Sequence, residues 1–279
     1  SYYDVFLHNC EGGKNLSNLE NIAVERSRNK LIYPPTEKIG VIVVDNFPAL
    51  GKLIALRFLE WVQNNQGGVI SLPTGRTPEY FIRAVSHYLN TWNKPETQAD
   101  LEENGLNPDK PPYMQSLHFV QIDEFFPIHP SQHNSFYYYV NNFYISEFSL
   151  DPEKAMLIDC SEIELPQNLS FEDVWSNSEV DLSLRYRQPH DEQEELQKLA
   201  IEAVDQWCYE YEERIRSLGG IGFFLGGIGP DGHIAFNVKG SDHNSTTCLT
   251  ETNYETQAAA ATALGGIEVA RKRLVITIG

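Results

Sequence analysis

The sequence predicts an α/β fold with a mainly parallel, Rossmann-like sheet and helices on both faces. Short continuous runs of β-branched and apolar residues recur along the chain, as strands buried on both faces require, and amphipathic helical patterns separate them. Strands joined through helices form right-handed crossovers and therefore align in parallel. In such sheets, ligands bind just beyond the carboxyl ends of the strands.

The predicted elements alternate regularly after an N-terminal stretch. Residues 1–37 are polar and aperiodic and indicate an extension or arm, whereas residues 38–279 form the predicted α/β domain. Strands are expected over residues 39–44, 69–72, 117–122, 221–225 and 275–278. Helices are expected over residues 46–65, with Asp45 as the cap, and over 79–89, 136–148 and 193–218. The acid-rich stretches 90–114 and 159–192 are interpreted as surface loops.

Composition argues against several classes of partner. Thirty-nine acidic and 21 basic residues give a formal net charge of −18, whereas a nucleic-acid surface needs clustered Lys and Arg. No apolar run approaches the roughly 20 residues that cross a bilayer, and the first residues lack a signal-peptide pattern. We therefore expect a cytoplasmic protein without a membrane partner. Reduced thiols are expected at widely spaced positions without a CxxC pair: Cys10, Cys160, Cys208 and Cys248.

The first of three loops that follow predicted strands is LPTGRTP, residues 72–78, which also opens a helix. Backbone amides, two hydroxyls and a cation could hold a phosphate here, offered by Thr74, Gly75, Arg76 and Thr77. A strand, turn and helix with Gly and Pro is also ordinary turn chemistry, so this loop alone leaves both interpretations open.

The second loop places two adjacent carboxylates, Asp123 and Glu124, directly after a predicted buried strand. A fixed carboxylate whose pKa is raised by partial burial can move protons on a sugar, and Asp123 is well placed for that role. The alternative is that Asp123 caps a turn and Glu124 is solvated. His129 and His133 lie in a Pro-containing loop without an evident third ligand, so we interpret them as surface histidines and predict no metal site.

The third loop, FLGGIGPDGHIAFN, runs from a predicted strand through several glycines into Asp231, Gly232 and His233. Such glycine density is costly in conformational entropy unless the backbone turns sharply or lies against a ligand, and we assign Gly227 to ligand binding. Asp231 and His233 provide an acid and an imidazole that can exchange a proton with a sugar oxygen. A lone His is more often structural, but one that follows a glycine-rich loop after a strand favours function.

Together, the three loops resemble the glucosamine-6-phosphate deaminase family, also called glucosamine-6-phosphate isomerase. LPTGRTP resembles its sugar-phosphate loop, IDEF its M-D-E-Y segment, and GGIGPDGHIAFN its G-G-x-G-x-D-G-H-I-A-F-N signature. The resemblance implies conversion of glucosamine 6-phosphate and water to fructose 6-phosphate and ammonia, without a redox cofactor or a catalytic metal. It implies that Asp123 is the general base at C2 and that His233, beside Asp231, assists ring opening. Substrate binding would fall to the residues of the first loop, with Glu124 and Gly227.

The chain departs from the family pattern in three places. Val238 follows Asn237, where the family has a Glu that supports the catalytic His, so we expect His233 to lack that partner. Thr262 stands where an ungapped alignment places a phosphate-binding Arg, and the sequence ends near the strand that precedes the family's phosphate-binding Lys. The domain is therefore expected to lack the family's C-terminal segment and to bind its substrate more weakly.

These departures leave two alternatives open. One is a non-catalytic, sugar-phosphate-binding regulatory domain, and the other is 6-phosphogluconolactonase, whose signature also contains a D-G-H turn. The expected partner in every case is a small-molecule sugar phosphate. A homo-oligomer or an additional domain in a longer chain is compatible with the sequence.

Overall fold

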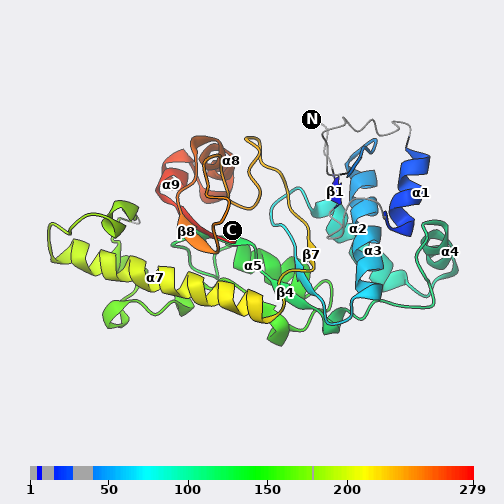
Figure 1. Cartoon of the computed structure of the whole chain (residues 1–279), viewed down its shortest axis with the longest axis horizontal. Coiled ribbons are helices and arrows are strands. Elements are labelled where there is room, and N and C mark those ends of the chain that lie inside the picture. Colours follow the sequence, from blue (N-terminus) through cyan, green and yellow to red (C-terminus); the bar gives the residue numbers. More distant parts are fainter. Residues whose placement is uncertain (1–4, 8–15, 28–39, 178) are drawn as a thin grey trace. The chain divides into compact units, whose positions relative to one another are not determined.

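The computed structural model describes residues 5–7, 16–27, 40–177 and 179–279 (Figure 1). The chain divides into two compact units. Unit 1 comprises the described residues up to Gly68, together with 75–117 and 143–152. Unit 2 comprises 69–74, 118–142 and the described residues from Glu153 to Gly279.

Unit 1 is mainly helical. Its longer elements are β1 (Val5–Leu7), α1 (Asn18–Arg26), β2 (Gly40–Ile42), α2 (Phe47–Asn64), α3 (Glu79–Thr91) and α4 (Pro95–Glu103), with η1 (Met114–Ser116) as a single turn. Helices α2 and α3 lie side by side (Figure 1). The rings of Phe58, Phe81 and Phe148 pack at centroid distances of 5.7–6.1 Å. Helix α1 lies within the predicted arm and joins α2 through an ion pair of 2.7 Å between Glu20 and Arg57.

Unit 1 confirms helices α2 and α3 but corrects three details of the prediction. The side chain of Asn46, not Asp45, caps α2, because it accepts the Ala49 N–H at 2.9 Å. The strand predicted over 39–44 is shorter and pairs antiparallel with β1, outside the parallel sheet. The predicted loop 90–114 contains α4, whose first residue is Pro95, a residue suited to the first position of a helix.

Unit 2 contains the parallel sheet that the sequence predicts, which confirms the α/β class. Its strands are β3 (Val69–Ser71), β4 (His118–Val120), β6 (Ala155–Met156) and β7 (Phe223–Phe224), in the order β6-β4-β3-β7. Val69 lies opposite His118, and Ile70 lies opposite Phe223. Because β7 is an edge strand, it is only partly covered rather than buried as predicted, and Phe224 is exposed.

A second, antiparallel sheet in unit 2 was not predicted. It consists of β5 (Asp123–Phe126), β8 (Cys248–Thr250) and β9 (Leu274–Thr277), in the order β5-β9-β8. Asp123 lies opposite Thr277, and Phe126 lies opposite Leu274. The sequence indicated β9 as a strand but assigned the residues of β5 to a loop, because two carboxylates interrupt the apolar pattern.

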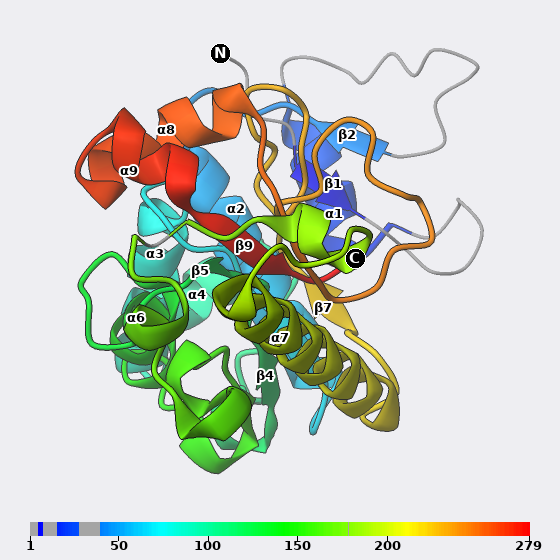
Figure 2. The ribbon, with the colours of Figure 1, turned by 90° about the vertical axis from the view of Figure 1, so that its left-hand side faces the viewer.

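The remaining elements of unit 2 cover these sheets. They are α5 (Phe136–Val140), η3 (Pro152–Lys154), η4 (Cys160–Glu162), η5 (Pro166–Asn168), α6 (Phe171–Val174), η6 (Leu182–Arg185), α7 (Glu192–Ser217), α8 (Tyr254–Leu264) and α9 (Ile267–Lys272). A π-helical turn, η2 (Asn141–Ile145), continues α5. Figure 2 shows α8 and α9 side by side next to β9. The helix predicted over 193–218 is confirmed, whereas the one predicted over 136–148 is α-helical only to Val140 and ends with η2 at Ile145.

The acidic stretch 159–192 is not only a surface loop, which corrects the prediction. Cys160, Ile163, Leu165 and Trp175 are buried in the same apolar core as the inner face of α7. The four residues contribute apolar surface that composition alone conceals, because acidic residues alternate with them in sequence.

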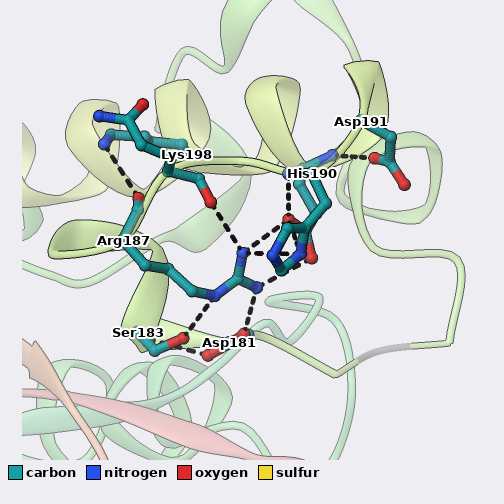
Figure 3. Close-up of polar contacts among 8 residues, drawn as sticks. Asp181, Ser183, Arg187, His190, Asp191 and Lys198 are labelled. Carbon is teal, nitrogen blue, oxygen red and sulfur yellow. Dashed lines mark hydrogen bonds and ion pairs between the residues drawn. The ribbon is translucent and has the colours of Figure 1, made fainter.

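A charged network fastens the end of this stretch to the first turn of α7 (Figure 3). The Arg187 guanidinium contacts Asp181 at 2.8 Å and Glu194 at 2.6 Å, and its Nε donates to the Ser183 hydroxyl at 3.0 Å. Hydrogen bonds from Arg187 hold the pKa of Glu194 down at about 2. The Asp191 side chain caps α7 by accepting the Glu194 N–H at 2.8 Å.

Two further sequence predictions concern cysteines and membranes. Cys160, Cys208 and Cys248 are unpaired thiols in the described part of the chain, and Cys10 lies outside the described residues. Among the helices that the structure describes, none combines the length and apolar character needed to cross a bilayer.

Candidate functional site

Three segments leave the parallel sheet of unit 2 at the carboxyl ends of its strands. The Ser71 hydroxyl donates to the Val120 carbonyl at 2.6 Å, and the Leu225 N–H donates to the Ser71 carbonyl at 3.0 Å. Because the strands are parallel and in register, the residues that follow β3, β4 and β7 emerge together. Thr74, Asp123 and the glycine-rich loop therefore extend from one end of the sheet.

Asp123 is a buried carboxyl group at the start of β5, with 8% of its surface exposed. Its position is fixed by the ladder to β9 and by the Gln121 side-chain amide, which donates to the Asp123 carbonyl at 2.8 Å. Burial, and to a lesser extent the neighbouring charge of Glu124, raises the pKa of Asp123 to about 8. Because Asp123 belongs to strand β5, the alternative that it caps a turn is wrong.

Glu124 is fully covered, so the alternative that it is solvated is wrong. Its carboxylate accepts backbone N–H groups from Phe125 at 2.9 Å, Phe136 at 3.0 Å and Tyr137 at 2.7 Å. Burial raises the pKa of Glu124, although these three donors favour the ionised form. Glu124 joins β5 to the first turn of α5, and its role in substrate binding stays a prediction.

Asp231 and His233 form a directly paired acid and imidazole. The distance from Asp231 Oδ1 to His233 Nδ1 is 2.5 Å, and only 12% and 14% of the two side chains is exposed. The Asn253 amide donates to the other Asp231 oxygen, and this bond, with the one to His233, holds the pKa of Asp231 at about 2. An ionised carboxylate only accepts hydrogen bonds, so Nδ1 carries hydrogen and Nε2 is left for proton exchange.

This pair corrects the expectation that His233 has no carboxylate partner because Val238 replaces the family's Glu. Asp231, two residues earlier in the same turn, orients the imidazole instead. The Thr256 hydroxyl lies 3.3 Å from the same ring nitrogen. Asn253 also caps α8 by accepting the Thr256 N–H at 3.0 Å. The same side chain therefore holds both the start of α8 and the Asp231 carboxylate.

The turn that carries His233 is fastened beside Asp123 through the end of β9. The Thr277 hydroxyl accepts the Phe236 N–H at 3.1 Å, and Thr277 lies directly opposite Asp123 in the ladder. The Asn237 side chain donates to the Ile278 carbonyl at 2.8 Å, and the Ile278 N–H donates to the Ile122 carbonyl at 3.1 Å. The end of β9 thus contacts both the strand that carries Asp123 and the turn that carries His233.

Thr277→Val is expected to destabilise this support. Val has nearly the same shape, but it leaves the buried Phe236 N–H without an acceptor, which costs about 1–3 kcal/mol of unfolding free energy. Urea denaturation measures the loss. Thr250→Val on the neighbouring strand is the matched control, because its hydroxyl makes only a long contact of 3.5 Å with the Glu251 carbonyl. An equal loss in both variants would contradict the assigned role of Thr277.

The other predicted site residues lie on exposed or partly exposed backbone. Thr74 is partly exposed in unit 2, while Gly75, Arg76 and Thr77 are exposed in unit 1, ahead of α3. Gly75 has a φ of +99°, which favours glycine, and Gly227 is an exposed position. His129 and His133 are both exposed, and the described residues contain no group of three His, Cys, Asp or Glu suited to a metal ion.

Sequence reasoning missed Asn253, Thr256 and Thr277 as partners of the site. Asn253 precedes a polar and alanine-rich stretch, which is a helix-start signal that could have located the cap. The contacts of Thr277 depend on an antiparallel pairing across more than 150 residues of chain, and no local pattern encodes it. Thr262 lies exposed on α8, and its uncharged side chain supplies no cation there.

Fold and site together define an α/β protein with a buried carboxyl group and an Asp–His pair beyond the carboxyl ends of parallel strands. No family model matches the chain. Over 72 residues the chain is 46% identical to the glucosamine-6-phosphate deaminase of Caenorhabditis elegans, covering 26% of this chain and 27% of that protein. Over 44 residues it is 61% identical to the enzyme of the same name from Bacteroides fragilis, covering 16% of each.

A solved monomeric glucosamine-6-phosphate deaminase has a similar fold. Its TM-score is 0.56 at 20% identity, and the match covers 84% of this chain and 73% of that one. The chain matches about a quarter or less of the length of these curated relatives. The sequence similarities over 72 and 44 residues confirm the resemblance to the glucosamine-6-phosphate deaminase family, and the solved structure shows a similar fold.

Proposed function

We propose that the chain carries an amino-sugar phosphate deaminase/isomerase site that converts glucosamine 6-phosphate and water to fructose 6-phosphate and ammonia. One observation supports this most strongly. The Asp231–His233 pair, at 2.5 Å, is anchored through Thr277 opposite Asp123, a buried carboxyl group that can gain and lose a proton near neutral pH.

The proposed reaction divides the proton transfers between these groups. His233, oriented by Asp231, takes the proton of the C1 hydroxyl through Nε2 and passes it to the ring oxygen, so the ring bond breaks and the opened sugar carries an aldehyde at C1. Asp123 removes the proton from C2, and the C1 oxygen takes a proton from solvent, which gives an enol that bears the amine. Asp123 then returns its proton to C1, which gives a protonated imine at C2. Water hydrolyses the imine to the ketone of fructose 6-phosphate and releases ammonia.

Phosphate binding is assigned to the LPTGRTP loop. Its amides, the Thr74 and Thr77 hydroxyls and the Arg76 guanidinium are the proposed donors, and substrate binding by Gly227 stays a prediction. A chain with a net charge of −18 needs such a local device to hold an anion. The exposed loop residues Gly75, Arg76 and Thr77 are accessible for this role.

The rate is expected to rise with pH. Asp123 acts as a base only after it loses its proton, so kcat/KM should increase to a plateau with a midpoint near pH 8. Initial rates at subsaturating glucosamine 6-phosphate measure this profile. A profile that is flat across about pH 6–9 would contradict a base with a raised pKa.

Turnover tests the proposal directly. The chain, together with any residues that follow Gly279 in the gene product, is incubated with glucosamine 6-phosphate, and ammonia and fructose 6-phosphate are quantified. Equal amounts of both products are expected. Hydrolysis of 6-phosphogluconolactone without ammonia release from glucosamine 6-phosphate would replace the proposal with the lactonase alternative.

A second candidate is a non-catalytic sugar-phosphate-binding domain, which the exposed Thr262 favours because it leaves this part of α8 without a phosphate-binding cation. Calorimetry with glucosamine 6-phosphate separates the candidates. Saturable binding with no product would favour the binding domain, whereas the absence of both binding and turnover would remove both.

A further inference from the structure

A cavity of about 370 Å³ lies within unit 2, apart from the residues of the candidate site. Its wall combines residues that follow β5, the acidic segment before α7, and Arg273, which precedes β9. Asp123, Asp231 and His233 do not line it. Its volume lies in the range of small-molecule sites, which is roughly 300–1,000 Å³.

Arg273 and Trp175 are incompletely paired groups of this wall. Arg273, which is partly buried, donates through Nη1 to the Pro127 carbonyl, and no carboxylate of the described residues lies within ion-pair distance. Burial lowers the pKa of Arg273, which indicates that the protein compensates its charge poorly. Trp175 is 1% exposed, and its indole Nε1–H has no acceptor among the described residues.

The rest of the wall selects the kind of ligand. Ile163, Leu165 and Phe171 offer apolar surface, which suits a compact hydrophobic body. A single guanidinium matches a carboxylate through two parallel hydrogen bonds. Glu172 also lines the cavity, and its negative charge disfavours a doubly charged phosphate.

We propose that this cavity binds a small organic carboxylate with an aromatic or branched aliphatic body, held by the Arg273 guanidinium. The carboxylate supplies the counter-charge that Arg273 lacks among the described residues, the apolar walls enclose the body, and Trp175, which lines the cavity, reports its occupation. The proposal does not depend on the proposed function, because the two sets of residues are distinct.

Titration of the full chain with benzoate tests the proposal, and benzamide is the matched uncharged probe. The Trp175 Nε1–H resonance, assigned through Trp175→Phe, is followed by ¹H–¹⁵N NMR. Benzoate is expected to shift this resonance saturably, and benzamide is expected to bind at least tenfold more weakly. No saturable shift with benzoate, or equal binding of the two probes, would overturn the proposal in the unsubstituted protein.

A substitution then tests the guanidinium. Arg273→Met is expected to weaken benzoate binding at least tenfold. Arg271→Met is the control, because Arg271 is exposed on α9 and contacts Glu268 at 3.1 Å. Undiminished binding by folded Arg273→Met, or displacement of benzoate by glucosamine 6-phosphate, would contradict a separate carboxylate site.

Discussion

Asp123→Asn is expected to reduce turnover of glucosamine 6-phosphate by on the order of 10²–10⁴-fold, with little change in KM. The amide has nearly the same shape as the carboxyl group, but it cannot take the proton from C2. Because Asp123 belongs to the β5–β9 ladder through its backbone, the substitution leaves the sheet pairing intact. Steady-state rates of fructose 6-phosphate formation measure the loss.

The same variant should be at least as stable as the parent protein. The pKa of Asp123 is raised in the folded state, so its contribution to stability is complete below the ordinary Asp pKa and is lost as pH rises toward about 8. Asn has no charge to bury, so the advantage of the variant in urea denaturation should grow over this interval. If Asp123→Asn were inactive because it unfolds, it would be less stable than the parent protein in urea denaturation.

The control for Asp123→Asn is Asp109→Asn. Asp109 is an exposed carboxylate in unit 1, so the control makes the same chemical change away from the site. Its activity should match that of the parent protein. If Asp123→Asn retained parental activity, Asp123 could not be the base at C2.

Asp231→Asn is expected to have the second large effect, a loss of kcat on the order of 10²–10⁴-fold. Asp231 holds the His233 Nδ1–H at 2.5 Å and would stabilise a positive charge on the imidazole. An amide cannot supply that charge, and its nitrogen would oppose either the His233 or the Asn253 donor. Steady-state kinetics measure kcat, and two-dimensional ¹H–¹⁵N NMR of His233 measures the tautomer.

Asp242→Asn is the matched control for Asp231→Asn. Asp242 is exposed farther along the same segment, where it accepts the Asn244 N–H at 2.9 Å without contacting His233. The tautomer should change only in Asp231→Asn. Parental kcat in that variant, together with an altered tautomer, would mean that orientation by Asp231 has no part in the reaction.

Local sequence patterns predicted the elements in which one physical signal dominates. The mainly apolar run over residues 69–72 predicted β3, and the periodic apolar face of α2 predicted that helix. Strand β5 was missed because its sequence, DEFF, places two carboxylates where a buried strand normally has apolar side chains. Backbone pairing with β9 and the three N–H donors to Glu124 stabilise a strand that propensity does not favour.

The sequence indicated the candidate residues of the site but not the residues that contact them. Asp123, Asp231 and His233 stand out locally, because acid and imidazole groups follow strands and glycines. Their supports come from distant segments, including Asn253 on Asp231 and Thr277 on the His233 turn. Such contacts arise from tertiary packing, so the expectation of an unsupported His233 is wrong, whereas the catalytic role of His233 stays a prediction.

A crystal structure of Asp123→Asn with glucosamine 6-phosphate tests most directly whether these groups enclose one sugar. The variant should trap the substrate before the proton leaves C2. We expect C2 to lie about 3–3.5 Å from the residue 123 side chain, with His233 Nε2 in hydrogen-bond reach of the ring oxygen. A sugar bound away from both residues would contradict the proposed proton-transfer site.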